Sequence, residues 1–257
     1  MAGPRSDPRI VETRPESLRG STLVVGFPTH GLVGSVAVSY LVHSLGMTPL
    51  GYLQSDRLPP TVVMEAGEVQ PPVRLYSSRE FPGAERKGSP LVAVLSDIQP
   101  PPELLNGIGK RLLDYAETKG VKLVVALEGQ PVEETPPGDV RVVAMSNRSA
   151  TRIREEYRFP PATGLVTGFA GALLSASVGR KLPVLCLVAQ AHKGHPDARA
   201  AARVLEILRP MVPRLAIDTR PLRRKAEEIE GELRRNIVQQ RASMKELSEP
   251  GAGEMYR

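Results

Sequence analysis

Short β-branched runs alternate with helical stretches from residue 21 onwards, and this alternation constrains the fold more than any other feature of the chain. Four of the runs, "TLVV", "LVAVLSD", "KLVVALEG" and "PVLCLVA", are apolar and lie beside Gly or Pro, as buried strands do. The stretches between them have apolar residues at helical spacing, as in "PELLNGIGKRLLDYAETKG". This alternation indicates helices on both faces of a sheet. We predict an α/β three-layer sandwich with a mixed, largely parallel sheet.

The chain divides into a body and two flanking parts. Residues 1–20 are rich in Pro, Arg and Glu and lack periodicity, so we interpret them as an N-terminal lead-in, compatible with an edge strand in its last part. Residues 21–220 form the predicted α/β domain. Between residues 48 and 90, the pieces "LGYLQS", "TVVMEA" and "PVRLYSS" follow one another without a clear helix. We expect these pieces to extend the sheet with antiparallel strands.

Composition and charge exclude several classes of function. The formal charge is +6, but acids are interleaved with the bases in "RRKAEEIEGELRR", which is typical of a solvated helix face rather than a nucleic-acid site. The absence of Trp disfavours stacking platforms for single strands. The apolar stretch 31–46 is too short to span a bilayer, no signal peptide is apparent, and Cys186 lies in a strand-like run as a core residue. We expect a soluble, cytoplasmic protein without membrane or nucleic-acid partners.

An apolar stripe continues after Pro221 on an otherwise polar segment. Its main positions are Leu222, Ile229, Leu233, Ile237 and Met244. The spacing predicts a helix over 221–247, roughly 39 Å long, followed by a flexible tail at 248–257. A helix this polar needs a partner for its stripe, because isolated helices are marginal. We predict that the stripe is the seam of a homo-oligomer, with docking on its own domain as the alternative.

Two glycine-rich segments lie where a strand passes into a helix, and both are candidate ligand loops. The first, "GFPTHGLVGSVAVSYL", contains Gly26, Gly31 and Gly34; the second, "ATGLVTGFAGALLSA", contains Gly164 and Gly168. Neither spacing matches a known nucleotide-binding motif, so we favour tight turns and close helix packing over phosphate binding. Two such helix starts in one sheet could line one pocket, which keeps open an enzyme of the nucleoside-phosphorylase type.

The sequence offers few candidates for catalytic or metal-binding side chains. His192, His195 and Asp197 lie together in "AQAHKGHPD", but a metal needs three or four converging ligands, so we interpret this segment as a loop before a helix, with Pro196 near its first turn. Four acids follow apolar runs: Glu65, Asp97, Glu103 and Glu128. We interpret them as helix caps and solvated loop acids. We therefore predict no catalytic residue, no metal and no cofactor.

Three motifs in order resemble the proteasome assembly chaperone family in its archaeal form. They are "GFPTHGLVGSVA", where the family has sequences like "GWPDAGLVGSIA"; "TGFAG", a glycine-rich helix start; and "HPDARAAARVLEIL", similar to the family's "PDPRAA" helix start. The resemblance covers roughly residues 20–215. The chain departs from it at Thr29 and His30, where an acid and a small residue are commoner.

The resemblance implies a fold and a mode of action. It implies a three-layer α/β domain similar to purine nucleoside phosphorylases but without an established activity, which works by binding proteasome subunits and forms homo-oligomers. Some archaeal members end in a hydrophobic-Tyr-X tripeptide that docks between α subunits of the core particle. Met255, Tyr256 and Arg257 match this tripeptide position by position. The expected function is an ATP-independent proteasome assembly chaperone or activator that binds the α-ring through this tail.

The chemistry of the tripeptide suits such docking. Met255 offers an apolar anchor, Tyr256 an aromatic face and a hydroxyl, and Arg257 a carboxylate for a basic group. Ordering one short tail costs entropy that nearly cancels its gain, so one tail binds weakly. Several tails from one oligomer raise the avidity by roughly 10² or more, provided that their linkers reach. The long helix and the tail are therefore expected to act together.

Overall fold

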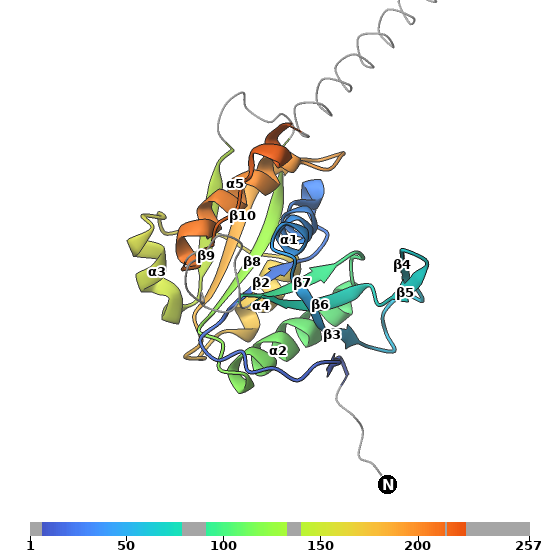
Figure 1. The fold of residues 1–257 in the computed structure, drawn as a ribbon. Coiled ribbons are helices and arrows are strands. Elements are labelled where there is room, and N and C mark those ends of the chain that lie inside the picture. The colour runs from blue at the N-terminus through green and yellow to red at the C-terminus, as the bar shows by residue number, and fades with distance from the viewer. Residues whose placement is uncertain (1–6, 79–90, 133–139, 214, 225–257) are drawn as a thin grey trace, which may run out of the picture.

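The computed structural model describes residues 7–78, 91–132, 140–213 and 215–224. Its centre is an eight-stranded mixed sheet with helices on both faces (Figure 1). The strand order is β1-β3-β6-β7-β2-β8-β10-β9. The four central strands run parallel to one another: β7 (Leu91–Ser96), β2 (Thr22–Gly26), β8 (Leu123–Val132) and β10 (Val184–His192). The predicted α/β fold with a mixed sheet is confirmed.

Antiparallel strands flank this parallel centre on both sides. On one side lie β6 (Val73–Ser78), β3 (Thr48–Gln54) and β1 (Arg9–Glu12), and on the other lies β9 (Val142–Ser146). The antiparallel extension by residues 48–54 and 73–78 agrees with the sequence prediction. The lead-in does contain an edge strand, β1, but in its middle and not in its last part. Parallel pairing is confined to the four central strands, so the sheet is less parallel than the sequence pattern predicted.

The piece "TVVMEA" does not join the main sheet, and the prediction for it is wrong. Its strand β4 (Val63–Glu65) pairs only with β5 (Glu68–Gln70), in a separate two-stranded ribbon. Proline pairs at 59–60 and 71–72 flank this ribbon. Because proline has no N–H to donate, both chain segments that lead into the ribbon are poor partners for a sheet ladder.

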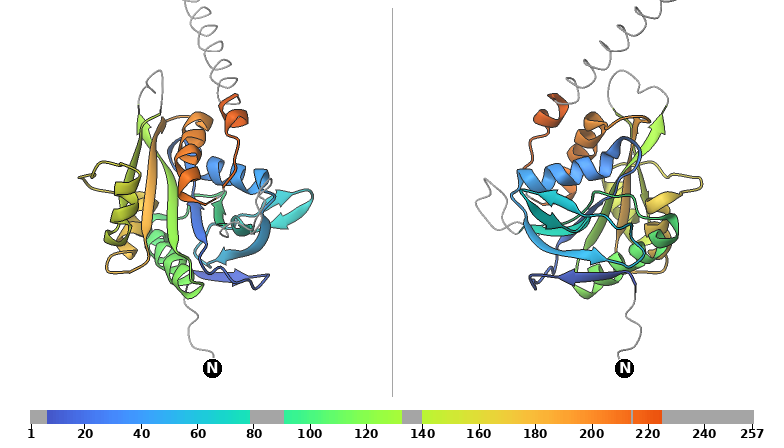
Figure 2. Two further views of the ribbon diagram at one scale, coloured as in Figure 1. Left: turned by 60° about the vertical axis from the view of Figure 1, so that its left-hand side comes forward. Right: turned by 90° about the vertical axis from the view of Figure 1, so that its right-hand side faces the viewer.

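Helices cover the two faces of the sheet in pairs, as Figures 1 and 2 show. Helices α1 (Val33–Ser44) and α5 (Ala198–Leu208) pack on one face, and α2 (Pro102–Thr118) and α4 (Gly168–Ala176) pack on the other. The short helix α3 (Thr151–Glu156) follows β9 in the chain. Single 3₁₀ turns span His30–Leu32, Arg148–Ala150 and Arg209–Met211. The three layers match the prediction.

The core lies in two clusters, one on each side of the sheet. Alternate residues of β8 belong to opposite clusters, with Leu127 beneath α1 and Ala126 toward α2 and α4. Cys186 is buried in the second cluster, as the sequence predicted. Burial of this aliphatic surface is the main force that holds the helices on the sheet.

Residues 220–224, at the start of the segment for which a long helix was predicted, are helical. Leu222 is only 8% exposed and belongs to the cluster beneath α1 and α5, so this first residue of the stripe packs within its own chain. The remaining stripe residues lie outside the described residues, as do most of the predicted helix 221–247 and the tail 248–257. Among the described residues, no helix has the length and apolar character that a bilayer span requires.

Candidate functional site

A large cleft of about 1790 Å³ opens beside the carboxyl ends of the central strands. Four segments that follow the parallel strands line it: residues 27–32 after β2, 99–100 after β7, 128–131 at the end of β8 and 193–196 after β10. In α/β sheets, this edge is where ligands usually bind. The cleft continues past β9 to the loop after α4.

The two glycine-rich segments meet at this cleft, but their glycines have different tasks. Gly31, Gly164 and Gly168 line the cleft. Gly26 and Gly34 instead allow close packing, because a Cβ at Gly34 would collide with the Leu127 carbonyl oxygen and one at Gly26 would collide with the backbone of Gly34. For these two glycines, the packing role that we favoured is confirmed.

Gly31 shapes the first loop through its backbone. Its φ of 62° lies in the left-handed region, and a Cβ there would approach the Cβ of Ala191 to 2.8 Å. Its carbonyl oxygen accepts a hydrogen bond of 2.8 Å from the N–H of Asp197. The Thr29 hydroxyl accepts a further bond of 3.1 Å from the N–H of Gly129. These bonds fix the loop to β8 and to the residue at which α5 begins.

Glu128 is the one acid among the described residues that line the cleft. It lies on β8 opposite Val188 of β10, and its side chain is 7% exposed. Its Oε1 atom is buried without a hydrogen-bond partner among the described residues. Burial raises the pKa of Glu128 to about 7, and a hydrogen bond from the backbone of Ala170 opposes this rise. The carboxyl group can therefore either donate or accept a proton near neutral pH.

This position corrects the interpretation of Glu128 as a cap or a solvated acid. The Ala170 N–H lies in the first turn of α4, so Glu128 does bind an N–H group at a helix start. It does so from strand β8, however, and as a buried residue. A signal was present in the sequence: in "KLVVALEG", the acid falls on the same face of the strand as Val124 and Ala126. Strand alternation alone therefore places this acid on a buried face.

The surroundings of Glu128 are apolar on the side of α2 and α4. The rings of Phe27 and Phe169 lie with their centroids 4.3 Å apart, at an angle of 31°. Leu105 of α2 and Val166 also line this part of the cleft. Such walls keep the local dielectric low, which strengthens any hydrogen bond made to the acid.

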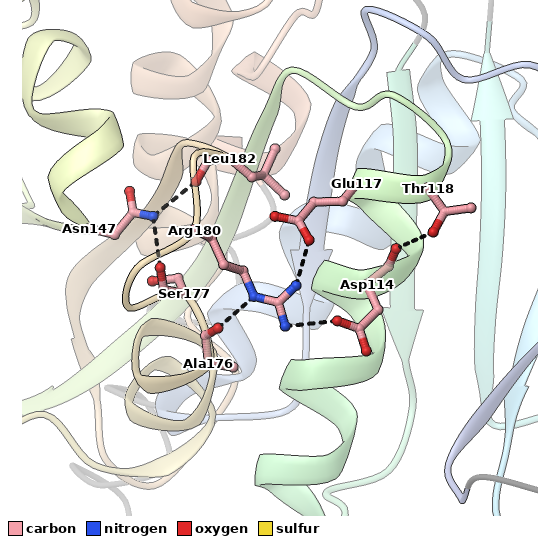
Figure 3. Close-up of polar contacts among 8 residues, drawn as sticks. All are labelled: Asp114, Glu117, Thr118, Asn147, Ala176, Ser177, Arg180 and Leu182. Carbon is pink, nitrogen blue, oxygen red and sulfur yellow. Dashed lines mark hydrogen bonds and ion pairs between the residues drawn. The ribbon is translucent and has the colours of Figure 1, made fainter.

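A polar network closes the far end of the cleft (Figure 3). The Arg180 guanidinium donates to Asp114 at 2.8 Å, to Glu117 at 2.7 Å and to the Ala176 carbonyl at 2.8 Å. These bonds raise the pKa of Arg180 against the opposing effect of burial. They tie the loop that follows α4 to helix α2.

Asn147 joins the chain segments on the other side of this network. Its amide nitrogen donates to the carbonyls of Ser177 and Leu182 at 3.3 and 2.9 Å (Figure 3). Its side-chain oxygen accepts from the N–H groups of Ala150 and Val184, each at 3.1 Å. The side chain thus uses its full hydrogen-bonding capacity to join three segments of chain. The sequence pattern did not single out either Asn147 or Arg180.

Basic side chains outnumber acids around the cleft. Besides the paired Arg180, the described lining residues include four further cations: Arg148, Arg154, Lys181 and Lys193. Glu128 is the only described acid that lines the cleft with them, although Arg154 also pairs with Glu155 at 3.8 Å outside the lining. Clefts lined by one sign of charge concentrate ligands of the opposite sign. The cleft therefore favours anionic ligands or acidic partner segments.

The histidine pair lies ahead of α5, as predicted, but only His195 is in the loop, because His192 is the last residue of β10. The rings of His192 and His195 stack with centroids 3.8 Å apart. Both Asp197 oxygens are used by the backbone: Oδ1 accepts from Ala200 at 2.9 Å and Oδ2 from His192 at 3.0 Å. Asp197 is the N-cap of α5. Its carboxylate is therefore committed to helix capping.

The other three acids that the sequence analysis named lie outside the cleft. Glu103 is in the first turn of α2, as expected of a helix-start acid. Glu65 and Asp97 both bind Arg74, at 3.1 and 2.7 Å. These two contacts join the β4–β5 ribbon to β6 and to the end of β7. None of the three lines the cleft.

The base of the C-terminal segment is fastened to α5. Arg223 donates to both carboxylate oxygens of Glu206 at 2.8 Å, and the Thr219 hydroxyl donates at 3.1 Å. These bonds lower the pKa of Glu206 although burial opposes them. The Tyr40 hydroxyl donates to the Asp218 carbonyl at 2.6 Å. Four side chains thus hold residues 218–223 against the domain.

The fold and the cleft define a three-layer α/β domain with an anion-favouring cleft at the carboxyl edge of its parallel strands. The chain belongs to the PAC2 family, whose model matches residues 23–237. It is similar to an uncharacterized protein of Methanocaldococcus jannaschii, with 27% identity over 231 residues that cover 88% of this chain and 89% of that protein.

Solved structures of two archaeal proteins are also similar. PbaA of Pyrococcus furiosus, an archaeal homologue of proteasome-assembly chaperone, is 27% identical, with a TM-score of 0.76 and coverage of 93% of this chain and 96% of that one. PbaB of the same organism, an archaeal proteasome activator, shares the fold at 23% identity, a TM-score of 0.76 and coverage of 90% and 98%. The resemblance to the family inferred from the sequence motifs is confirmed.

Proposed function

We propose that this protein is an ATP-independent proteasome assembly chaperone or activator that binds the α-ring of the core particle. The observation that carries the proposal is its membership of the PAC2 family together with the match of Met255, Tyr256 and Arg257 to a hydrophobic-Tyr-X tripeptide. The similarity to PbaA, described as a homologue of a proteasome-assembly chaperone, supports the choice of partner. On this proposal, the protein acts in the cytoplasm by binding, not by catalysis.

The domain and the tail have separate tasks in this proposal. Leu222 and the bonds between Glu206 and Arg223 hold the start of the C-terminal segment against the domain. The residues beyond this base gather subunits into a homo-oligomer through the stripe at Ile229, Leu233, Ile237 and Met244. Each subunit then contributes one tail, and the tails bind the ring at high effective concentration.

Replacing Tyr256 tests the docking step. Tyr256→Ala removes the aromatic face and the hydroxyl, and we expect it to abolish retention of the protein on immobilised core particle at micromolar concentration. Tyr157→Phe is a matched control, because it changes a tyrosine on the domain surface, whose hydroxyl donates to the Pro210 carbonyl. Retention of Tyr256→Ala at the level of the wild type would contradict docking through the tail.

Truncation after Asp218 tests the oligomer seam. We expect the truncated chain to have a lower oligomeric mass than the full chain when both are measured by light scattering after gel filtration. A mass per assembly that still corresponds to the same number of subunits would reject the seam. Circular dichroism of the truncated chain shows whether the α/β domain keeps its fold after the loss of Leu222.

A further inference from the structure

The β4–β5 ribbon carries an apolar patch on one of its faces. Met64 and Val69 lie directly opposite each other in the register of the two strands, so their side chains share a face. Val62, the residue before β4, is two places from Met64, which puts it on the same face of an extended chain. Val62, Met64 and Val69, which we call the ribbon patch, are 56%, 61% and 63% exposed. Single exposed apolar residues are ordinary, but three that gather on so small an element indicate a contact surface.

The opposite face of the ribbon is held against the domain. There Glu65 lies opposite Glu68, and the Glu65 carboxylate accepts a hydrogen bond of 3.1 Å from Arg74. The Arg74 side chain is only 10% exposed and also donates to Asp97 at 2.7 Å. The ribbon patch is therefore turned away from the domain. The Glu68 side chain has no partner among the described residues, although like charges directly opposite each other are destabilising, so an uncompensated acid lies beside the patch.

The far end of the cleft carries the opposite charge. Two exposed cations and one exposed apolar side chain line it there, and we call them the basic rim: Arg148, Lys181 and Val178. Asn147 and Ser149 join the two chain segments of the rim by donating three hydrogen bonds, of 3.3, 2.9 and 2.8 Å, to carbonyl groups of residues 177–182; Figure 3 shows the two from Asn147. Val178 is 80% exposed, and neither cation has an acidic partner among the described residues.

The ribbon patch and the cleft account for all six large apolar side chains that are exposed among the described residues. Three form the ribbon patch, and the other three line the cleft: Leu32, Leu165 and Val178. At about 1790 Å³, the cleft exceeds the roughly 300–1,000 Å³ of small-molecule pockets, so it suits a segment of protein. A projecting apolar ribbon with a free acid and a hollow with free cations are complementary in shape, polarity and charge.

The ribbon patch and the basic rim lie at opposite ends of the main sheet (Figure 1). In the chain, the ribbon lies between β3 and β6, which are next to the edge strand β1, whereas the rim follows β9, the other edge strand. One chain therefore cannot bring its ribbon to its own rim. A second copy of the chain can bring its ribbon there.

We propose that the ribbon patch of one subunit docks on the basic rim of a second copy, with Met64 and Val69 against Val178 and with Glu68 facing Arg148 and Lys181. Such a contact joins two different surfaces, so it repeats head to tail and builds a ring or an open chain of subunits. The inference goes beyond the proposed function, because this contact needs neither the tail nor the C-terminal stripe.

Thiol cross-linking of the full chain tests the contact. Met64→Cys and Val178→Cys place one thiol on each surface, while the native Cys186 is fully buried and stays unreactive. A short bismaleimide should link chains that carry both substitutions into a ladder of dimers and larger multimers, whereas chains that carry one substitution should stay unlinked. Linkage of either single variant would overturn the proposal, because like surfaces would then meet. The absence of a ladder in the double variant would overturn it as well.

Charge reversal tests the polar part of the contact through the dissociation constant of the assembly, measured by sedimentation equilibrium. We expect Glu68→Lys and Lys181→Glu each to raise this constant about tenfold or more, and the combined variant to restore it to within about threefold of the wild type. Glu68→Lys leaves the ribbon intact, because opposite charges then face each other across it at Glu65. Lys110→Glu, at an exposed residue of α2 outside the cleft, is the matched control and should leave the constant unchanged. Single variants that associate like the wild type, or a combined variant as weak as the singles, would overturn the proposal.

Discussion

Replacing Glu128 by Gln should change how the stability of the protein depends on pH. The pKa of Glu128 is about 7 in the folded protein, against an ordinary value of 4.5, because the side chain is 7% exposed. The folded state therefore binds the proton more tightly than the unfolded state, and the wild type loses stability as the pH rises from 4.5 to 7. At 1.36 kcal/mol per pKa unit, the full loss is about 3 kcal/mol, of which about 2.5 kcal/mol falls between pH 5 and pH 8.

The variant isolates this effect because Gln cannot ionise. Urea unfolding of the wild type and of Glu128→Gln at equal protein concentration gives the difference in the free energy of unfolding at each pH. We expect the variant to gain about 2.5 kcal/mol on the wild type between pH 5 and pH 8, while groups that titrate in both proteins cancel. A difference that is constant within about 0.5 kcal/mol would refute the reasoning, since it would mean that the Glu128 carboxyl ionises as an exposed acid does.

Three further substitutions test the packing around the cleft and the base of the C-terminal segment. Gly34→Ala should lower the free energy of unfolding, measured in urea, by about 1–3 kcal/mol, because its Cβ would collide with backbone atoms. Gly194→Ala is the control and should leave this free energy unchanged, because the nearest atoms to its Cβ lie at 4.0 Å. Arg180→Ala should cost about 1–2 kcal/mol by the same assay, and Arg180→Lys should not restore it, because an ammonium cannot bind Asp114, Glu117 and a carbonyl together. Arg223→Ala should speed hydrogen exchange of the amides of residues 220 and 222–224, because it removes both bonds to Glu206; unchanged exchange would show that these bonds do not hold the segment.

Much of the architecture could be predicted from periodicity. The alternation of apolar runs and helical stretches places α1, α2, α4 and α5 and all four central strands, because each of these elements is long enough to have a clear buried face. The ribbon β4–β5 could not be predicted in this way, because its three-residue strands are mostly exposed and have no buried face. The proportion of parallel pairing was overestimated because a strand's direction depends on the connection that precedes it, which the apolar pattern of β9 does not reveal.

The candidate site was predicted only in part. The sequence analysis left open that the two glycine loops line one pocket, and Gly31 and Gly168 do line one cleft. Strand alternation places Glu128 on a buried face, but which of the four acids lines the cleft depends on strand register and on the approach of α4, so the sequence analysis did not distinguish Glu128 from the other three. Besides local bonds to Ala176 and Ala150, Arg180 and Asn147 make contacts across sequence separations of 66 and 30 residues, and no local pattern encodes such distant contacts.

The most direct test of the central claim is the affinity of the protein for isolated α-ring, measured with residues 255–257 present and removed. The account predicts that removal weakens binding at least about 100-fold, because every tail of the assembly loses its anchor at once. The oligomeric mass should stay unchanged. Adding two glycines after Arg257 should weaken binding similarly, because it displaces the carboxylate. An affinity within about threefold of the full chain after removal would contradict docking through the tail, since about 0.7 kcal/mol is too small for a multivalent anchor.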